Sequence, residues 1–438
     1  MRAKRASKGA SGQAPFETIA ARSPQGAVSR GIRNSCIPGS ARGYDRNVTS
    51  ALRPTGPGSG IGAGDRPVLD RTALRLVFLI PGGLALLLGL NAALLLLGLW
   101  APLSFANIAA MHAPLMVFGF VGTFVVLERA VAARRWWGFA APALLGLGSL
   151  VLLSPLPLAV GKTMLALGMV ALLAVYLVIW RRLPAAATAI QILGAVSGLS
   201  ATLLWLSSAT IPMLVPGMAV FLILTIAGER LELGRVSPVL DARAERLGLA
   251  SALLLVALVP IAPLWPGVGY PLLGTALALL VVWLFRYDVA TRLVNTTGLP
   301  RYMAACLLAG YVWLIVASGI WLVVGQVTSG PLYDAVLHSI FLGFVLSMIM
   351  AHAPVILPAV LRKPLPYRWF LYLPVLLLHA SLVVRLLIGD ARGLTGAVQW
   401  GGVLNVAAVL QFVILAVASS VLGPPRRVET NRIEKVGG

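Results

Sequence analysis

Residues 75–100 read RLVFLIPGGLALLLGLNAALLLLGLW, with a single charged residue at the first position. A helix of about 20 apolar residues is long enough to cross the hydrocarbon core of a bilayer. Similar apolar stretches follow one another through the rest of the chain, with short connections between them. Their repetition predicts an all-α fold, a polytopic membrane helical bundle.

The composition of the whole chain excludes an ordinary soluble protein. Of 438 residues, 59% are apolar and 11% are charged, whereas soluble domains have about 45–50% apolar and about 25% charged residues. The net charge of +21 would indicate a polyanion partner in a soluble chain. In a membrane protein it reflects orientation and contact with anionic lipid, so we expect a lipid bilayer and no nucleic acid as partner.

The apolar stretches place twelve membrane helices in residues 71–423. They lie near 75–100, 105–127, 138–158, 160–180, 186–207, 211–228, 247–265, 267–286, 303–325, 332–357, 369–388 and 398–422.

The charges of the connections indicate the orientation of these helices. Connections after even-numbered helices carry fifteen Lys and Arg residues, and the opposite connections carry only Lys162 and Arg392, with Arg385 inside a helix end. The fifteen are Arg129, Arg134, Arg135, Arg181, Arg182, Arg230, Arg235, Arg243, Arg246, Arg286, Arg292, Arg301, Arg362, Lys363 and Arg368. By the positive-inside rule, both termini are cytoplasmic. We therefore expect a multi-pass protein of the prokaryotic inner (cell) membrane.

Two tails flank the predicted bundle. Residues 1–70 hold eleven Lys and Arg residues against four Asp and Glu, and their Arg, Ser, Gly and Pro content predicts a disordered basic tail. The same composition would result from upstream sequence translated from a start codon placed too early. Residues 424–438 are predicted to form a short cytoplasmic tail.

The polar residues within the spans limit the chemistry. No Asp, Glu or Lys lies in the middle of a predicted span, which argues against a proton pump. Phosphate-binding loops, HExxH and GxSxG motifs are also absent from the sequence, so the sequence leaves open whether the protein is an enzyme.

All four histidines fall inside predicted spans: His112 in the second, His338 and His352 in the tenth, and His379 in the eleventh. Imidazole is a common ligand of haem iron and copper, although a membrane histidine also serves as a hydrogen bonder between helices. His112 and His338 both lie six or seven residues from the outer helix ends, about 10 Å deep, so they could face one ligand.

The other two histidines would form a second, inner pair. His352 lies fourteen residues after His338, about 21 Å along the helix axis, so the two cannot share a metal. His352 and His379 reach one depth only if the tenth helix continues past Pro354. We consider this pair a candidate metal site on that condition.

Two further polar residues lie near the outer pair. Asp334 precedes His338 by one turn and could accept a hydrogen bond from its ring, as carboxylates behind metal-bound histidines do; it could equally be a solvated acid at a loop end. Arg385 could neutralise haem propionates, or extend to lipid headgroups.

The segments that carry these histidines resemble a known family. They are residues 74–79 (LRLVFL), residues 111–122 (MHAPLMVFGFVG), and Leu337-His338 followed by Gly343, Met348 and residues 364–367 (PLPY). They resemble the NnrS family of twelve-span membrane proteins, which contain haem and copper and are associated with nitric oxide metabolism. The resemblance implies that His112 and His338 are cofactor ligands. Ala113 and Pro114 stand where that family tends to have a second polar or histidine residue, so copper is less strongly implied than haem.

Our main hypothesis is a haem-binding, and secondarily copper-binding, membrane protein with a redox or nitric-oxide-related role, with respiratory-chain or denitrification proteins as partners. Two alternatives remain open. Proline pairs within spans, such as Pro354 and Pro358, are typical of transporters with broken helices, here for a small hydrophobic or zwitterionic molecule. The third hypothesis is an assembly factor for a respiratory complex.

Overall fold

The structure is a computed structural model that describes residues 72–105, 107–234 and 241–423. Every regular element in these ranges is a helix, and they contain no strand. The predicted all-α polytopic membrane bundle is thereby confirmed. The predicted tails, 1–70 and 424–438, and Arg235 lie outside the described residues.

Eleven helices in the described ranges are long and apolar enough to cross a membrane. The simple ones are α1 (Thr72–Leu96), α5 (Leu158–Arg182), α6 (Ala186–Leu206), α7 (Ile211–Gly234), α8 (Ala242–Leu264), α9 (Pro266–Tyr287), α11 (Gly298–Val323) and α15 (Thr395–Leu422). The predicted span at 138–158 is a shorter apolar helix, made of η5 (Trp136–Phe139) and α4 (Ala140–Val151). A further short helix, α10 (Ala290–Leu293), lies in a connection.

The other three long helices each change from α-helix to π-helix along their length. Their parts are η3 (Ala109–Met111), α2 (His112–Pro114), η4 (Leu115–Gly122) and α3 (Thr123–Ala133); α12 (Gly330–His338), η6 (Ser339–Leu346) and α13 (Ser347–Leu361); and η7 (Trp369–Leu371), α14 (Tyr372–Leu382), η8 (Val383–Gly389) and η9 (Asp390–Arg392). The segments η4, η6 and η8 are π-helical. Such segments are rare and frequently occur at functional sites.

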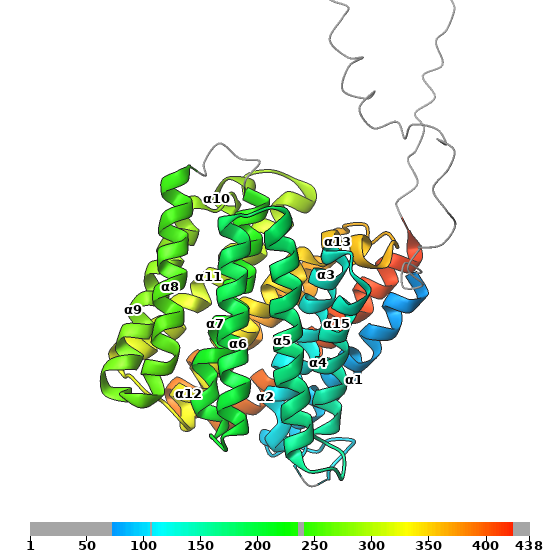
Figure 1. Cartoon of the computed structure of the whole chain (residues 1–438). Coiled ribbons are helices and arrows are strands. Elements are labelled where there is room, and N and C mark those ends of the chain that lie inside the picture. Colours follow the sequence, from blue (N-terminus) through cyan, green and yellow to red (C-terminus); the bar gives the residue numbers. More distant parts are fainter. Residues whose placement is uncertain (1–71, 106, 235–240, 424–438) are drawn as a thin grey trace, which may run out of the picture. The chain divides into compact units, whose positions relative to one another are not determined.

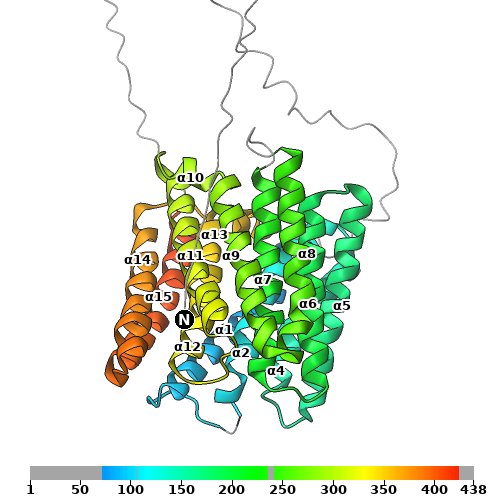
Figure 2. The ribbon, with the colours of Figure 1, turned by 90° about the vertical axis from the view of Figure 1, so that its left-hand side faces the viewer.

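Helix α7 forms the centre of the bundle. In the most apolar stretch of α7, 83% of the residues are buried, whereas the figure is 39% for α1, α5 and α15. Helix α7 packs most extensively against α6. In Figures 1 and 2, α2 and α12 lie at one end of the helices, and α10 and α13 lie near the other. We call these the α12 end and the α10 end.

The outward faces of the peripheral helices are apolar. Val77 and Leu87 of α1, Val170 of α5, and Ile414 and Val417 of α15 are all among the exposed large hydrophobic side chains. Exposed apolar surface of this extent marks contact with lipid rather than water. Since lipid offers the backbone no hydrogen bonds, the helical conformation satisfies each peptide group within its own segment.

Two arginines that the sequence analysis assigned to connections are buried inside helices instead. Arg129 belongs to α3 and Arg230 to α7, and their exposed fractions are 7% and 5%. The predicted spans at 105–127 and 211–228 were too short, because both helices continue to Ala133 and Gly234. These two arginines are buried partners of acidic side chains, described below.

Candidate functional site

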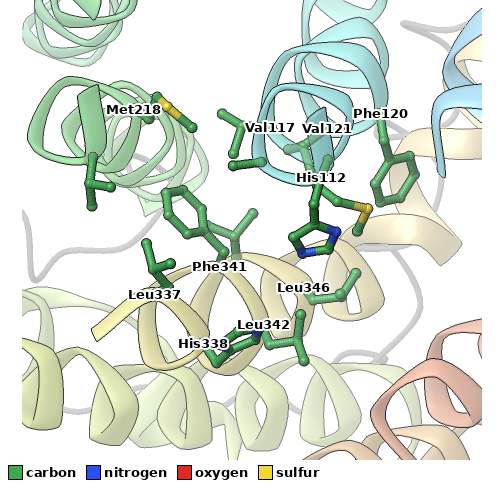
Figure 3. A pocket seen from close by; sticks show the side chains of 14 residues that line it. His112, Val117, Phe120, Val121, Met218, Leu337, His338, Phe341, Leu342 and Leu346 are labelled. Carbon is green, nitrogen blue, oxygen red and sulfur yellow. The ribbon is translucent and has the colours of Figure 1, made fainter. Parts of the chain in front are cut away.

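A cavity opens at the α12 end between α2–η4, α12–η6 and α7. It is small, with a volume of about 60 Å³ for the centres of water-sized molecules, and is lined by fourteen residues. Twelve of them are apolar, including Met116 and Met218, and the other two are His112 and His338. Figure 3 shows both imidazoles among these apolar side chains. The structure therefore brings the predicted outer pair of histidines to one cavity.

The His112 ring is fixed by a backbone carbonyl of α1. Its Nδ1 lies 2.8 Å from the carbonyl oxygen of Gly89, and because a carbonyl only accepts, Nδ1 must carry the proton. A Cβ at Gly89 would collide with the Met116 side chain, which would have to move away. In the described part of the chain, Nε2 has no hydrogen-bond partner, so its lone pair is left to the cavity.

The His338 ring is held in the same tautomer by Asp334. Its Nδ1 lies 3.0 Å from the backbone oxygen of Asp334 and 3.1 Å from Oδ1 of the same residue. Both atoms are acceptors, so Nδ1 donates and Nε2 keeps a lone pair. None of the described residues bonds to this Nε2 either. The two rings thus present unprotonated nitrogens to one cavity.

Arg385 anchors this arrangement from η8. Its Nε and one terminal nitrogen each lie 2.7 Å from the Asp334 carboxylate, in a bidentate pair. The guanidinium of Arg385 binds Asp334, and only 7% of the residue is exposed. This contact takes the place of the two roles that the sequence suggested for Arg385, binding haem propionates or lipid headgroups. The Arg385–Asp334–His338 chain orients the imidazole through charged hydrogen bonds, which are stronger than neutral ones.

The π-helical segments shape the cavity walls. The triplet Gly119-Phe120-Val121 lies in η4, and the matching triplet Gly343-Phe344-Val345 lies in η6. Phe120, Val121 and Val345 line the cavity. The segments η4 and η6 each begin within three residues after a cavity histidine. Their wider turns therefore determine which of the next side chains face the cavity.

The structure does not bring His352 and His379 into one site. His352 Nδ1 lies 2.7 Å from the Met348 carbonyl and must donate to it, so Nε2 accepts from Arg230 at 3.1 Å. A nitrogen that faces a guanidinium has no lone pair to offer a metal cation.

His379 belongs to a separate network within the bundle. Its Nδ1 accepts from the Trp313 indole at 2.9 Å, which places the proton on Nε2, 3.3 Å from the Ser347 hydroxyl. Ser347 in turn donates to the Gly343 carbonyl at 2.7 Å. Both nitrogens of each inner histidine are engaged, and no cluster of three or more His, Cys, Asp or Glu residues fit to hold a metal occurs in the described ranges. We therefore do not propose this pair as a metal site.

Sequence reasoning missed a buried ion pair at the α10 end. Asp288, in the connection after α9, accepts from Arg230 at 2.7 and 2.9 Å, from the Tyr311 hydroxyl at 2.6 Å and from the Ala290 amide at 2.8 Å. Burial by itself would raise the pKa of this carboxyl. The hydrogen bonds and charge of Arg230, with the Tyr311 hydroxyl and the Ala290 amide, outweigh burial and hold the pKa below its ordinary value.

This ion pair joins several parts of the bundle. Through Arg230, Asp288, Tyr311 and His352 it connects α7, the connection after α9, α11 and α13. The only sign of this pair in the sequence was Arg230, which lies just beyond a predicted span. An arginine in a cytoplasmic loop would have the same position.

Comparison with known proteins gives a family. The family model described as "Domain of unknown function (DUF8744)" matches residues 75–421, which contain both cavity histidines. No curated protein and no solved structure matches the chain.

Proposed function

The chain belongs to this family, a domain of unknown function, and we propose that it is a haem-binding membrane protein with a redox or nitric-oxide-related role. One observation carries the proposal. His112 and His338 each have Nδ1 held by an oxygen acceptor and Nε2 free of partners among the described residues, and both rings line one cavity.

These residues fit a haem in their chemistry. Metal-bound histidines usually donate their other ring nitrogen to a carbonyl or a carboxylate, which fixes the tautomer and raises the basicity of the ligand. Gly89 and Asp334 are such acceptors. The remaining walls are apolar, which suits a flat macrocycle and keeps water from the ligand nitrogens. When bound, a haem would supply a redox-active iron that also binds small gaseous ligands.

The nitric-oxide role and the cellular setting come from the sequence. The resemblance to the NnrS family supports the former, and the thirteen other positive residues predicted on one side, without the buried Arg129 and Arg230, support the prokaryotic inner membrane. Respiratory-chain or denitrification proteins would then be the natural partners. Copper remains a prediction from the resemblance, without a described cluster of ligands to support it.

The test is haem and iron content of the full chain purified in detergent. We expect one haem per chain in the wild type, a large loss in His112→Ala and in His338→Ala, and complete loss in the double variant. His379→Ala is the matched control, because that ring is bonded within the bundle and should leave haem content unchanged. A folded wild-type protein without haem would reject the proposal and leave the transporter and assembly-factor hypotheses.

A further inference from the structure

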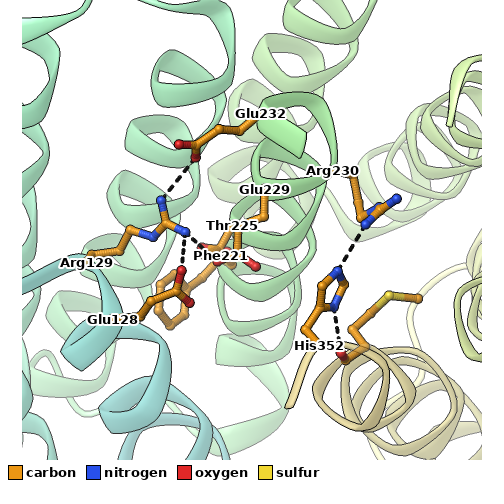
Figure 4. A network of polar contacts seen from close by, with 9 residues as sticks. Glu128, Arg129, Phe221, Thr225, Glu229, Arg230, Glu232 and His352 are labelled. Atoms are coloured by element: carbon orange, nitrogen blue, oxygen red, sulfur yellow. Dashed lines mark hydrogen bonds and ion pairs between the residues drawn. The ribbon is translucent and has the colours of Figure 1, made fainter. Parts of the chain in front are cut away.

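Three carboxylates surround one guanidinium at the α10 end of the bundle. Arg129 of α3 lies 2.7 Å from Glu128, 3.2 Å from Glu232 and 3.4 Å from Glu229. Figure 4 shows Arg129 between these side chains of α3 and α7. One positive charge therefore faces three acidic groups.

The three glutamates differ in their access to water. The Glu232 side chain is 56% exposed and the Glu128 side chain 22%, whereas that of Glu229 is only 9% exposed and has the longest contact with Arg129. The neighbouring Arg230 does not compensate Glu229, since its guanidinium is bound to Asp288 and His352. Among the described residues, Glu229 is thus a buried carboxyl group that shares its only positive partner, Arg129, with two other acids.

A buried carboxylate in this position is unfavourable when ionised. An unpaired charge in a low-dielectric interior costs several kcal/mol or more, and such groups take up a proton instead. Because membrane-spanning helices surround Glu229, little water is available to solvate a charge on its carboxylate. The charge count therefore favours the protonated form of Glu229.

Polar atoms that have no hydrogen-bond partner among the described residues lie next to the cluster. The Tyr176 hydroxyl of α5 is fully buried, has no hydrogen-bond partner in the part of the chain that the structure describes, and lies within electrostatic range of Arg129 and all three glutamates. Arg129 Nε is also buried without a partner. So is Gln191 Nε2 of α6, whose side chain packs against Gly228, next to Glu229. Such groups usually bind enclosed water, which is what proton exchange with a buried acid needs.

We propose that Glu229 is a reversible proton-binding site, separate from the cavity at the α12 end. Uptake forms an O–H bond on a Glu229 carboxylate oxygen with a proton from water at the α10 end, and no electron is transferred. The titratable and charged groups around it are Glu128 and Arg129 from α3, Tyr176 from α5, and Arg230 and Glu232 from α7. The ligand is a proton rather than a metal ion, because the guanidinium of Arg129 sits at the centre of the cluster and repels cations.

The site lies well away from the proposed haem. Met218 lines the cavity and Glu229 follows it by eleven residues on α7, which is about 16 Å along the helix axis. The proton site therefore does not rest on the proposed function, and either can fail alone.

Infrared spectroscopy of the full chain in detergent or lipid, in water and in deuterium oxide, tests the proposal. We expect an absorption band of a protonated carboxyl group at neutral pH that shifts in deuterium oxide and disappears in Glu229→Gln. Glu232→Gln is the matched control on the same helix and the same guanidinium; the Glu232 side chain is 56% exposed, so water screens its charge and the band should persist. Absence of the band in the wild type, or its persistence in Glu229→Gln, would overturn the proposal.

Two further measurements separate proton binding from a structural ion pair. Glutamine mimics a protonated glutamate, so Glu229→Gln should unfold at the same denaturant concentration as the wild type. A marked loss of stability would show an ionised Glu229 paired with Arg129, and would refute the proposal. Glu128→Gln removes a repelling charge and frees Arg129 for Glu229, so the band should be weaker than in the wild type at the same pH. An unchanged band there would also count against it.

Discussion

The buried Arg230–Asp288 pair allows a quantitative prediction for Asp288→Asn. The substitution keeps the size of the side chain but replaces one carboxylate oxygen with an amide NH2 group. That group would face donors of Arg230 and Tyr311 that now bind the carboxylate at 2.6–2.9 Å. Arg230, with a side chain 4% exposed, would keep a buried charge whose remaining contacts, the amide oxygen and the ring of His352, supply no negative charge.

The expected loss follows from these contacts. Removing one partner of a buried ion pair costs about 3–5 kcal/mol, since the other charge stays buried. Because α7, α11 and α13 meet at this point, the free energy of unfolding of the whole bundle should fall by that amount. Denaturant titration in detergent micelles, followed by helical circular dichroism, measures it.

A control substitution and a minimum expected loss complete this test. Asp241→Asn changes the N-cap of α8, where the side chain accepts from the Ala244 amide at 2.7 Å. Asn and Asp are about equally good caps, so the loss there should stay below about 0.5 kcal/mol. A loss below about 1 kcal/mol in Asp288→Asn, within the range of an ordinary hydrogen bond, would refute the buried pair.

The same carboxyl predicts a pH dependence. Folding holds the pKa of Asp288 below its ordinary value of 3.8, so its stabilising contribution is complete at neutral pH. It should decrease as the pH falls below about 4, where the unfolded chain binds the proton more readily than the folded chain. Asp288→Asn should lack this acid-side decrease, which unfolding titrations at a series of pH values would show.

Three further substitutions test other contacts. Asn91→Ala removes both hydrogen bonds, of 2.7 and 3.0 Å, that hold the backbone of the loop after α1; it should cost about 1–3 kcal/mol and expose that loop to limited proteolysis. Gly343→Val should cost about 1–3 kcal/mol of stability in denaturant titrations, because the indole of Trp313 covers that glycine. Gly319→Val is its control and should show no such cost, since a Cβ there would have no neighbouring atom within 4 Å. Asp334→Asn should lower haem occupancy by loosening the imidazole it orients, and haem content in Asp241→Asn, at the N-cap of α8, serves as its comparison.

Sequence periodicity was enough to predict the class of fold. Long apolar stretches leave no alternative to membrane helices, and every predicted span corresponds to a helix in the described ranges, one of them shorter than a full crossing. The contact between Asp334 and His338 was also within reach, because residues four apart on a helix are neighbours.

The remaining features depend on tertiary contacts. Arg129 and Arg230 look like loop residues in the sequence, and only their distant partners Glu229 and Asp288 show that they are buried. The π-helical segments arise from a shift in backbone hydrogen bonding that side-chain patterns do not encode. His352 and His379 were paired by depth alone, but depth does not decide which way a ring faces on its helix.

We propose above all that both imidazoles, those of His112 and His338, would hold the iron of a bound haem. Electron paramagnetic resonance of the oxidised protein measures this directly, because axial ligands determine the spin state of ferric iron. We predict a low-spin spectrum typical of two imidazole ligands in the wild type and a high-spin spectrum in His338→Ala. A wild-type spectrum with any other ligand set, such as one including Met116 or Met218 of the cavity wall, or a spectrum unchanged in His338→Ala, would contradict the claim.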